Sequence, residues 1–213
     1  MHHIELSTLE EVKDRQAKLT PAQAIQMLKD GNQRFVMKQT ANHDLHSQIK
    51  MTAHGQYPIA AIVSCIDSRV PAEIIFDTAI GDIFNARVAG NFVNTDILGS
   101  LEFACKVAGS KAIVVLGHTQ CGAVKGACDD VKLGNLTEML EKLMPAVSSV
   151  TEITEDRNSS NSEFVQKVAD SNVDHTIAVI RKKSPVLREM EGQGELRLVG
   201  AMYDVHTGKV TFR

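Results

Sequence analysis

The chain has 213 residues, enough to bury a substantial hydrophobic core, and its formal net charge of -3 shows no basic surplus of the kind that binds nucleic acid. Its composition, 43% hydrophobic and 23% charged, is that of a globular protein, and no apolar run reaches the length of a membrane span. The 4 cysteines are too few for a disulfide scaffold of this size, so we expect a reducing compartment or metal ligation.

The amino-terminal segment, MHHIELSTLEEVKDRQAKL, is polar and acidic, unlike a secretory signal peptide. We therefore expect a cytoplasmic protein; a leader removed before Met1 would leave no trace in this sequence. A helix is expected from about Thr8 to Leu19, within an amino-terminal helical arm of about residues 1–20. We expect one domain over residues 1–213, because the polar connector at 154–163 leads into a helix that has no partner core of its own.

Helix and strand signals alternate along the chain. In LTPAQAIQMLKDGNQRFVMKQ, Thr20 is a candidate cap and Pro21 takes the first helical position. The apolar run PIAAIVSC, rich in β-branched residues after Pro58, predicts a buried strand. The further predicted elements are a strand at 82–90, a helix at 95–109 closed by Gly109, a strand at 111–118, helices starting near Cys121 and covering 136–149 and 164–183, and two closing strands joined at HTGK. This alternation predicts an α/β fold with a mostly parallel central sheet flanked by helices.

Three potential metal ligands follow the ends of predicted strands. Cys65 ends the first apolar run, and His118 and Cys121 come at the end of the strand at 111–118. Sites in open parallel sheets form outside the carboxyl ends of the strands, so these three side chains can converge although they are far apart in sequence. Two thiolates and one imidazole suit zinc, with typical bonds of about 2.3 Å and about 2.0–2.1 Å.

The number of ligands points to a reactive metal. No fourth Cys or His has matching spacing, and an open fourth position is typical of catalytic rather than structural zinc. Asp67, two residues after Cys65, could bind the metal directly or accept a hydrogen bond from a metal-bound hydroxide. Arg69 could keep Asp67 ionised through a charge-assisted pair.

Taken together, Cys-x-Asp-Ser-Arg at 65–69 and His-x-x-Cys at 118–121 resemble the motif pair of the β-class carbonic anhydrases. The similarity extends from about Leu19 to the closing strands and includes GDIFNARVAGN and LGHTQCGAVKGA. The resemblance implies a four-stranded parallel core and one zinc ion per chain. It also implies a homodimer with its active site near the subunit interface, often paired further into a homotetramer.

The resemblance implies roles for individual residues. Cys65, His118 and Cys121 would bind zinc, and Asp67 with Arg69 would form a catalytic dyad that orients zinc-bound hydroxide. In the family, the counterpart of Asp67 can also swing onto zinc as a fourth ligand and switch the enzyme off. The implied reaction is the reversible hydration of carbon dioxide to bicarbonate and a proton. We expect the protein to bind this small substrate and neither nucleic acid nor a membrane.

Substrate-binding roles are implied for three more residues. Gln56 matches a family glutamine that donates a hydrogen bond to the substrate, and Phe84 matches an aromatic wall of the pocket. Phe103 stands where many relatives have a tyrosine, so a hydroxyl contact is missing there.

Two alternative functions remain open at this point. A related enzyme could use equivalents of Cys65, Asp67, His118 and Cys121 to hydrolyse carbon disulfide or carbonyl sulfide. A non-catalytic zinc-binding module is the other alternative, and the open fourth position argues against it. Thioredoxin-like redox chemistry and nucleotide binding lack their motifs, because neither Cys-x-x-Cys nor a glycine-rich phosphate loop occurs.

Other histidines and cysteines carry no metal prediction. His43 and His46, in HDLH, have ligand-like spacing but no third ligand, so we expect a solvated helix start there. Cys105 and Cys128 fall within predicted helices and are expected to serve packing.

Overall fold

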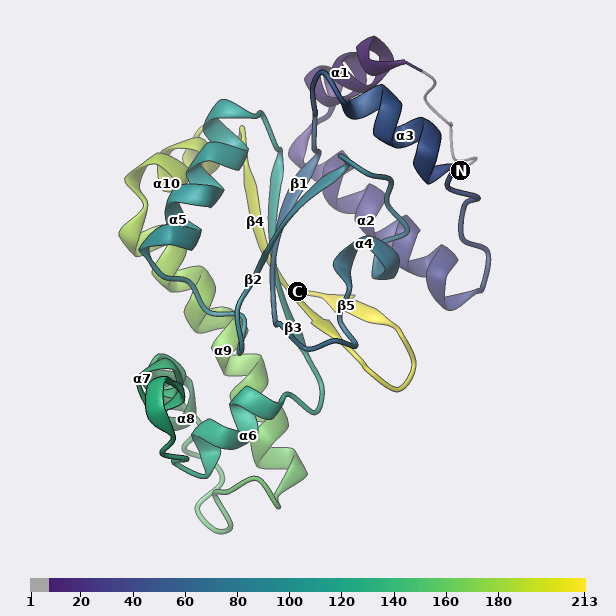
Figure 1. Ribbon diagram of the computed structural model, residues 1–213. Helices are drawn as coiled ribbons and strands as arrows, with labels where there is room; N and C mark the ends of the chain where they lie inside the picture. The colour runs from purple at the N-terminus through teal and green to yellow at the C-terminus, as the bar shows by residue number, and fades with distance from the viewer. Residues whose placement is uncertain (1–7) are drawn as a thin grey trace.

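The protein is built around one five-stranded sheet (Figure 1), seen here in a computed structural model that describes residues 8–213. Its strand order is β2-β1-β3-β4-β5. The first four strands in this order run parallel, and β5 pairs antiparallel with β4. The strand bounds are Ala60–Ser64 for β1, Ile83–Arg87 for β2, Ala112–His118 for β3, Arg197–Tyr203 for β4 and Val210–Phe212 for β5. The prediction of a mostly parallel α/β sheet is confirmed.

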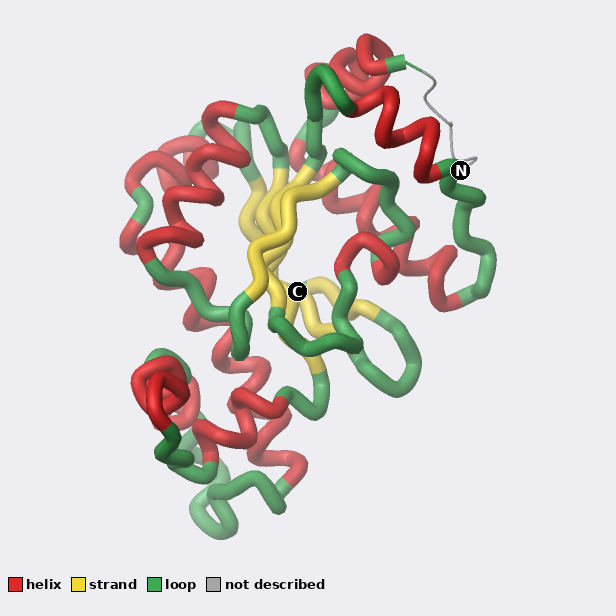
Figure 2. Tube along the Cα trace, viewed as in Figure 1, coloured by secondary structure: helices red, strands yellow, loops and turns green. Residues whose placement is uncertain are grey.

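Helices cover both faces of the sheet and one of its ends (Figures 1 and 2). One face packs against α2 and α4, and the other packs against α5, α9 and α10. A third apolar cluster, beyond the carboxyl ends of β1 and β3, joins α6, α7 and α8 to α9. The helix bounds are Leu9–Lys18 for α1, Pro21–Val36 for α2, Leu45–Thr52 for α3, Ala72–Ile75 for α4, Thr95–Glu102 for α5, Gly122–Cys128 for α6, Gly134–Glu141 for α7, Met144–Ser149 for α8, Ser162–Lys183 for α9 and Pro185–Gly192 for α10.

Burial along the strands follows from this layering. Every residue of β1 and of β3 is buried, because helices cover both sides of these two neighbouring central strands. The edge strand β2 is only partly buried. Because β1 and β3 are adjacent and parallel, the residues that follow them emerge side by side at the same end of the sheet.

The predicted start of α2 is confirmed. The Thr20 hydroxyl accepts a hydrogen bond from the Gln23 N–H, the Gln23 side chain reaches back to the Thr20 N–H, and Pro21 holds the first helical position. The helix α1 lies inside the predicted arm and has the same kind of reciprocal cap between Thr8 and Glu11. Residues 1–7 of that arm lie outside the described residues.

One helix prediction is wrong, and a second is confirmed with a change in its last turn. The segment predicted as one helix at 136–149 forms two, α7 and α8, because Pro145 lacks the N–H that would bond to the Glu141 carbonyl. The helix predicted at 95–109 continues from α5 into a π-helical turn, Phe103–Val107, before ending at Gly109 with a φ of 83°. The helix start expected in HDLH is confirmed by α3, which Asp44 caps, whereas the short helices α4 and α10 were not predicted. Among residues 8–213, no helix combines the length and apolar character needed to cross a membrane.

Candidate metal centre and active site

The three predicted ligands come together at the carboxyl ends of β1 and β3. Cys65 directly follows β1, His118 is the last residue of β3, and Cys121 caps the amino end of α6. Their ligand atoms all lie within 4.8 Å of one another, and the three residues are 4%, 0% and 1% exposed. A group of this size can close around a single ion with bonds of about 2.0–2.3 Å.

His118 is oriented as a metal ligand. Its Nδ1 lies 2.9 Å from the carbonyl oxygen of Thr119, which can only accept, so Nδ1 carries the proton. The other ring nitrogen, Nε2, is buried and has no hydrogen-bond partner among the described residues. Its lone pair therefore faces the two thiols, and a bound metal ion would satisfy it. The donor set and this unpaired nitrogen both fit zinc.

Thiolate character is concentrated on Cys65. The Cys121 thiol donates to Cys65 and lowers the Cys65 pKa, against the opposing effect of burial, and the Gly90 N–H, 3.4 Å from the Cys65 Sγ, acts in the same direction. The same contact, together with burial, raises the pKa of Cys121. The two sulfur atoms lie close enough to bind the same metal ion.

Asp67 lies beside this group but is held by Arg69. Arg69 donates from Nε to Asp67 Oδ1 at 2.9 Å and from Nη2 to Oδ2 at 2.7 Å, and its backbone N–H adds a third bond at 3.0 Å. The guanidinium hydrogen bonds hold the Asp67 pKa well below its usual range, although burial opposes them. Asp67 Oδ2 lies 3.9 Å from His118 Nε2. The carboxylate thus borders the metal position without occupying it.

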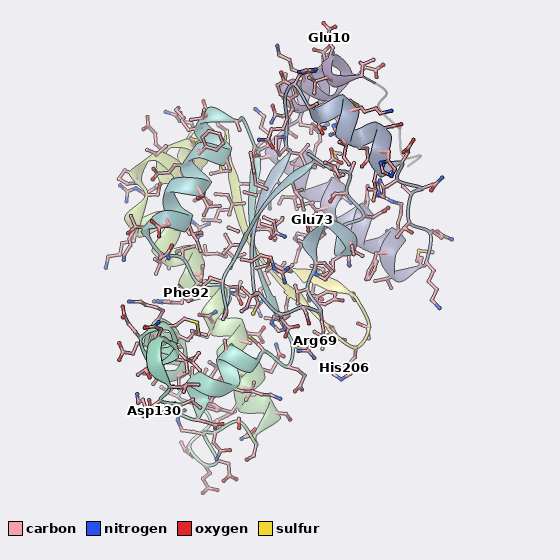
Figure 3. All side chains as sticks on the ribbon, in the orientation of Figure 1. Glu10, Arg69, Glu73, Phe92, Asp130 and His206 are labelled. Carbon is pink, nitrogen blue, oxygen red and sulfur yellow. The ribbon has the colours of Figure 1, made fainter. Side chains whose placement is uncertain are left out.

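Arg87, at the end of β2, supports the loop that carries Cys65 and Asp67. Its Nε donates to the Cys65 carbonyl at 2.9 Å and its Nη2 donates to the Asp67 carbonyl at 2.6 Å. Sequence reasoning did not anticipate this role. The available signal was the position of Arg87 at the carboxyl end of a strand that neighbours β1. Figure 3 labels Arg69 at the same end of the sheet as Phe92.

Comparison with known proteins identifies the family. A family model described as carbonic anhydrase matches residues 60–210. A solved β-carbonic anhydrase of Aspergillus fumigatus matches with a TM-score of 0.68 and 30% identity, covering 78% of this chain and 79% of that chain. The chain belongs to the β-class carbonic anhydrases. The resemblance read from the two motifs is therefore confirmed, and with it the class of enzyme.

Other carbonic anhydrases match over most of their length. Carbonic anhydrase 2 of Mycobacterium tuberculosis is 36% identical over 200 residues, covering 91% of this chain and 93% of that protein. One of two solved tetrameric β-carbonic anhydrases from Sordaria macrospora matches with a TM-score of 0.66 and 30% identity, covering 75% of this chain and 82% of that chain.

The predicted pocket residues of this β-carbonic anhydrase lie apart from its metal group within one chain. Gln56 precedes β1, at the opposite end of the strand from Cys65, and lines a hollow of about 650 Å³ between α1 and α3. Phe84, in β2, pairs in register with Ala61, four residues before Cys65, which is about 13 Å along a strand. Phe103 packs edge-on against Phe84 with ring centroids 6.2 Å apart, and it is 51% exposed. The structure brings the two phenylalanines together but not with Gln56.

Proposed function

We propose that this chain catalyses the reversible hydration of carbon dioxide to bicarbonate and a proton, using one zinc ion per chain held by Cys65, His118 and Cys121. The observation that carries the proposal is a buried three-ligand group bordered by a carboxylate that an arginine holds away from the fourth position. When bound, zinc would supply a nucleophile near neutral pH by lowering the pKa of a coordinated water molecule.

The protein side chains would orient the nucleophile and accept its hydrogen bond. Asp67 stays ionised because Arg69 donates to both carboxylate oxygens, so Asp67 can only accept hydrogen bonds. A carboxylate fixed in this way would hold one hydrogen of the nucleophile and leave a lone pair directed at the carbon atom of the substrate. Without Arg69, the same carboxylate would be free to turn onto the metal and exclude the nucleophile. The Arg69–Asp67 contact supports the active state, in which Asp67 is turned away from the fourth ligand position.

We further propose that Gln56, Phe84 and Phe103 serve the site of a second copy in a homodimer or homotetramer. Gln56 lies at the wrong end of β1 to reach its own metal group, and Phe103 presents an exposed ring. The outer edge of β2 has no neighbouring strand among residues 8–213, so this side of the sheet is available to a partner. The tetrameric Sordaria macrospora enzymes show that related chains assemble. We take each chain as one domain and its location as cytoplasmic, which suits a site that needs reduced thiols.

Stopped-flow measurement of carbon dioxide hydration over roughly pH 6.5 to 9, with metal content determined on the same sample, tests the proposal. Turnover with about one zinc per chain is the expected result. Asp67→Asn should retain zinc and lose most of the turnover. Zinc without turnover in the unmodified protein would favour carbon disulfide or carbonyl sulfide as substrate, and unchanged activity in Asp67→Asn would remove the dyad from the mechanism. Absence of zinc would refute the ligand assignment.

A further inference from the structure

A buried polar side chain of helix α9 contacts the turn beside the metal group. Asn172 is 1% exposed, and its Nδ2 donates to the Gly90 carbonyl oxygen at 2.7 Å. The N–H of the same glycine lies 3.4 Å from the Sγ of Cys65. A continuous line of contacts therefore runs from Asn172 through one peptide residue to a metal-ligand sulfur.

The Gly90 backbone needs this support because it is held in an unusual conformation. The chain turns between Val88 and Asn91, where the Asn91 N–H bonds to the Val88 carbonyl, and Gly90 has a φ of 84°. A Cβ at Gly90 would lie 2.7 Å from a Leu143 methyl, which would have to move, and the positive φ would strain any residue with a side chain. Asn91 follows with a φ of 43°. The Gly90 N–H therefore stays directed at the sulfur only if neighbouring groups hold this turn in place.

Burial of the Asn172 side-chain amide opposes folding. Asn172 lies on α9 between Ala169 and Val173, both buried in apolar clusters, and its own Oδ1 has no partner among residues 8–213. A buried polar group without a partner opposes folding, so packing alone gives no reason for an amide at this position. The Gly90 carbonyl does give one, because it requires a donor, and only the Nδ2 side of the amide can provide it.

We propose that Asn172 is a positioning residue for the metal centre: by holding the Gly90 carbonyl it aims the Gly90 N–H at the Cys65 sulfur and so strengthens metal binding. A hydrogen bond to a thiolate stabilises its charge and moderates how strongly it donates electrons to the metal. The 22-residue helix α9 spans the region from the third apolar cluster to the sheet, so it provides a rigid base for this contact. The inference rests on the proposed zinc site.

The test compares metal affinity in Asn172→Ala and Asn172→Leu with that of the unmodified protein, by competition with a chromophoric zinc chelator. Outer-sphere partners typically change metal affinity about 10–100-fold, and we expect a loss in that range. In the cobalt-substituted protein, the thiolate-to-cobalt charge-transfer band should move to longer wavelength, because the sulfur lone pairs lose a hydrogen bond. A residue that only supports the fold would leave both readouts unchanged.

The matched control is Asn32→Ala. Asn32 is also a buried asparagine, 4% exposed, that holds backbone groups of a loop, but its contacts are Ile75, Gly208 and Val210. This variant should lose stability and keep the zinc affinity and the cobalt spectrum of the unmodified protein. Equal affinity in the Asn172 variants and the unmodified protein would overturn the inference and leave the zinc site intact. An unmodified protein without zinc affinity would overturn both.

A measurement on the unmodified protein covers the case in which neither Asn172 variant folds. With a spin-active cadmium isotope in the site and the protein isotopically labelled, the Gly90 amide proton should show scalar coupling to the metal through the Cys65 sulfur. The side-chain amide protons of Asn172 should exchange slowly with solvent, as expected for a buried donor. Absence of the coupling, or fast exchange at Asn172, would refute the proposed contact.

Discussion

Arg69 and Asp67 form a bidentate ion pair, with the Arg69 Nε 2.9 Å from Asp67 Oδ1 and the Arg69 Nη2 2.7 Å from Asp67 Oδ2. The same Nη2 lies 3.3 Å from the Gln120 carbonyl, so the guanidinium also touches the loop between His118 and Cys121. The Arg69 side chain is 51% exposed and that of Asp67 only 16%, which places the pair at the boundary between the metal group and solvent. Its contribution is therefore to geometry more than to stability, because exposed ion pairs stabilise little.

This geometry predicts that Arg69→Lys fails almost as badly as Arg69→Ala. Lysine keeps the charge but cannot offer two parallel N–H groups, so the Asp67 carboxylate would no longer be held in one orientation. We expect kcat/KM for carbon dioxide hydration to fall about 10–100-fold or more in both variants, the range typical of lost orientation. Stopped-flow kinetics with metal analysis measures this, and the zinc content should stay unchanged.

Arg181→Lys provides the control for that substitution. Arg181, near the end of α9, makes the same bidentate contact, at 2.8 Å and 2.8 Å, with Glu191 on α10, and neither residue contacts the metal group. The kcat/KM of the Arg181→Lys variant should match that of the unmodified protein. Full activity in Arg69→Lys would show that charge alone, without the paired geometry, is sufficient.

Metal removal should lower the thermal stability. The three residues join the ends of β1 and β3 to the start of α6, so zinc held by them would stabilise the folded chain and not the unfolded one. At a free zinc concentration of about 100 times Kd the linkage is worth about 2.7 kcal/mol, or about 5–10 °C in Tm for a chain of this size. Calorimetry before and after chelation measures the shift. Zinc should restore the original Tm and magnesium should not, and an unchanged Tm after chelation would contradict a folded-state metal site.

The parts that the sequence predicted were those with a local signature. Cys65, His118 and Cys121 lie at or just after the ends of two strands that are recognisable as apolar runs in the sequence, and the parallel topology then brings them together. Contacts between distant segments had no such signature. His43, expected at a solvated helix start, instead bonds to Asp77 at 2.9 Å, across 34 residues. The contact from Asn172 to Gly90 spans 82 residues and is set by the docking of α9.

Asp77 is a buried carboxylate outside the metal group, and it forms the centre of such a long-range cluster. Its side chain is 1% exposed and accepts from Arg34 Nε at 2.6 Å, His43 Nε2 at 2.9 Å and the Ala41 N–H at 3.1 Å. Burial raises the pKa of this carboxyl, but the three donors outweigh burial and lower it overall. The ionised form is therefore the one that stabilises the fold.

The lowered pKa of Asp77 determines how the free energy of unfolding changes with pH. The contribution of Asp77 is complete above the unfolded value of about 3.9 and is lost as the pH falls through the lower folded value. Asp77→Asn should therefore lower the free energy of unfolding at neutral pH by about 1.5–3 kcal/mol and flatten its decline in acid. Urea unfolding of the metal-free protein over roughly pH 3 to 7 avoids the confounding loss of zinc. Asp130→Asn is the control, because Asp130 is 68% exposed, and a similar loss in both variants would contradict a special role for Asp77.

Gln16 ties α1 to the sheet through two backbone carbonyls. It is 7% exposed, and its Nε2 donates to the Pro58 oxygen at 2.7 Å and to the Ala108 oxygen at 2.8 Å, joining the segments that lead into β1 and out of the π-helical turn. Gln16→Ala would leave both carbonyls without this donor, and we expect the free energy of unfolding to fall by about 2–3 kcal/mol. The exposed Gln26, which bonds only to Asp30 on its own helix, gives the control Gln26→Ala, for which a change within about 0.5 kcal/mol is expected. Equal stability of the two variants in urea would mean that α1 is not held by Gln16, and activity per bound zinc should be unaffected in either case, because neither residue touches the metal group.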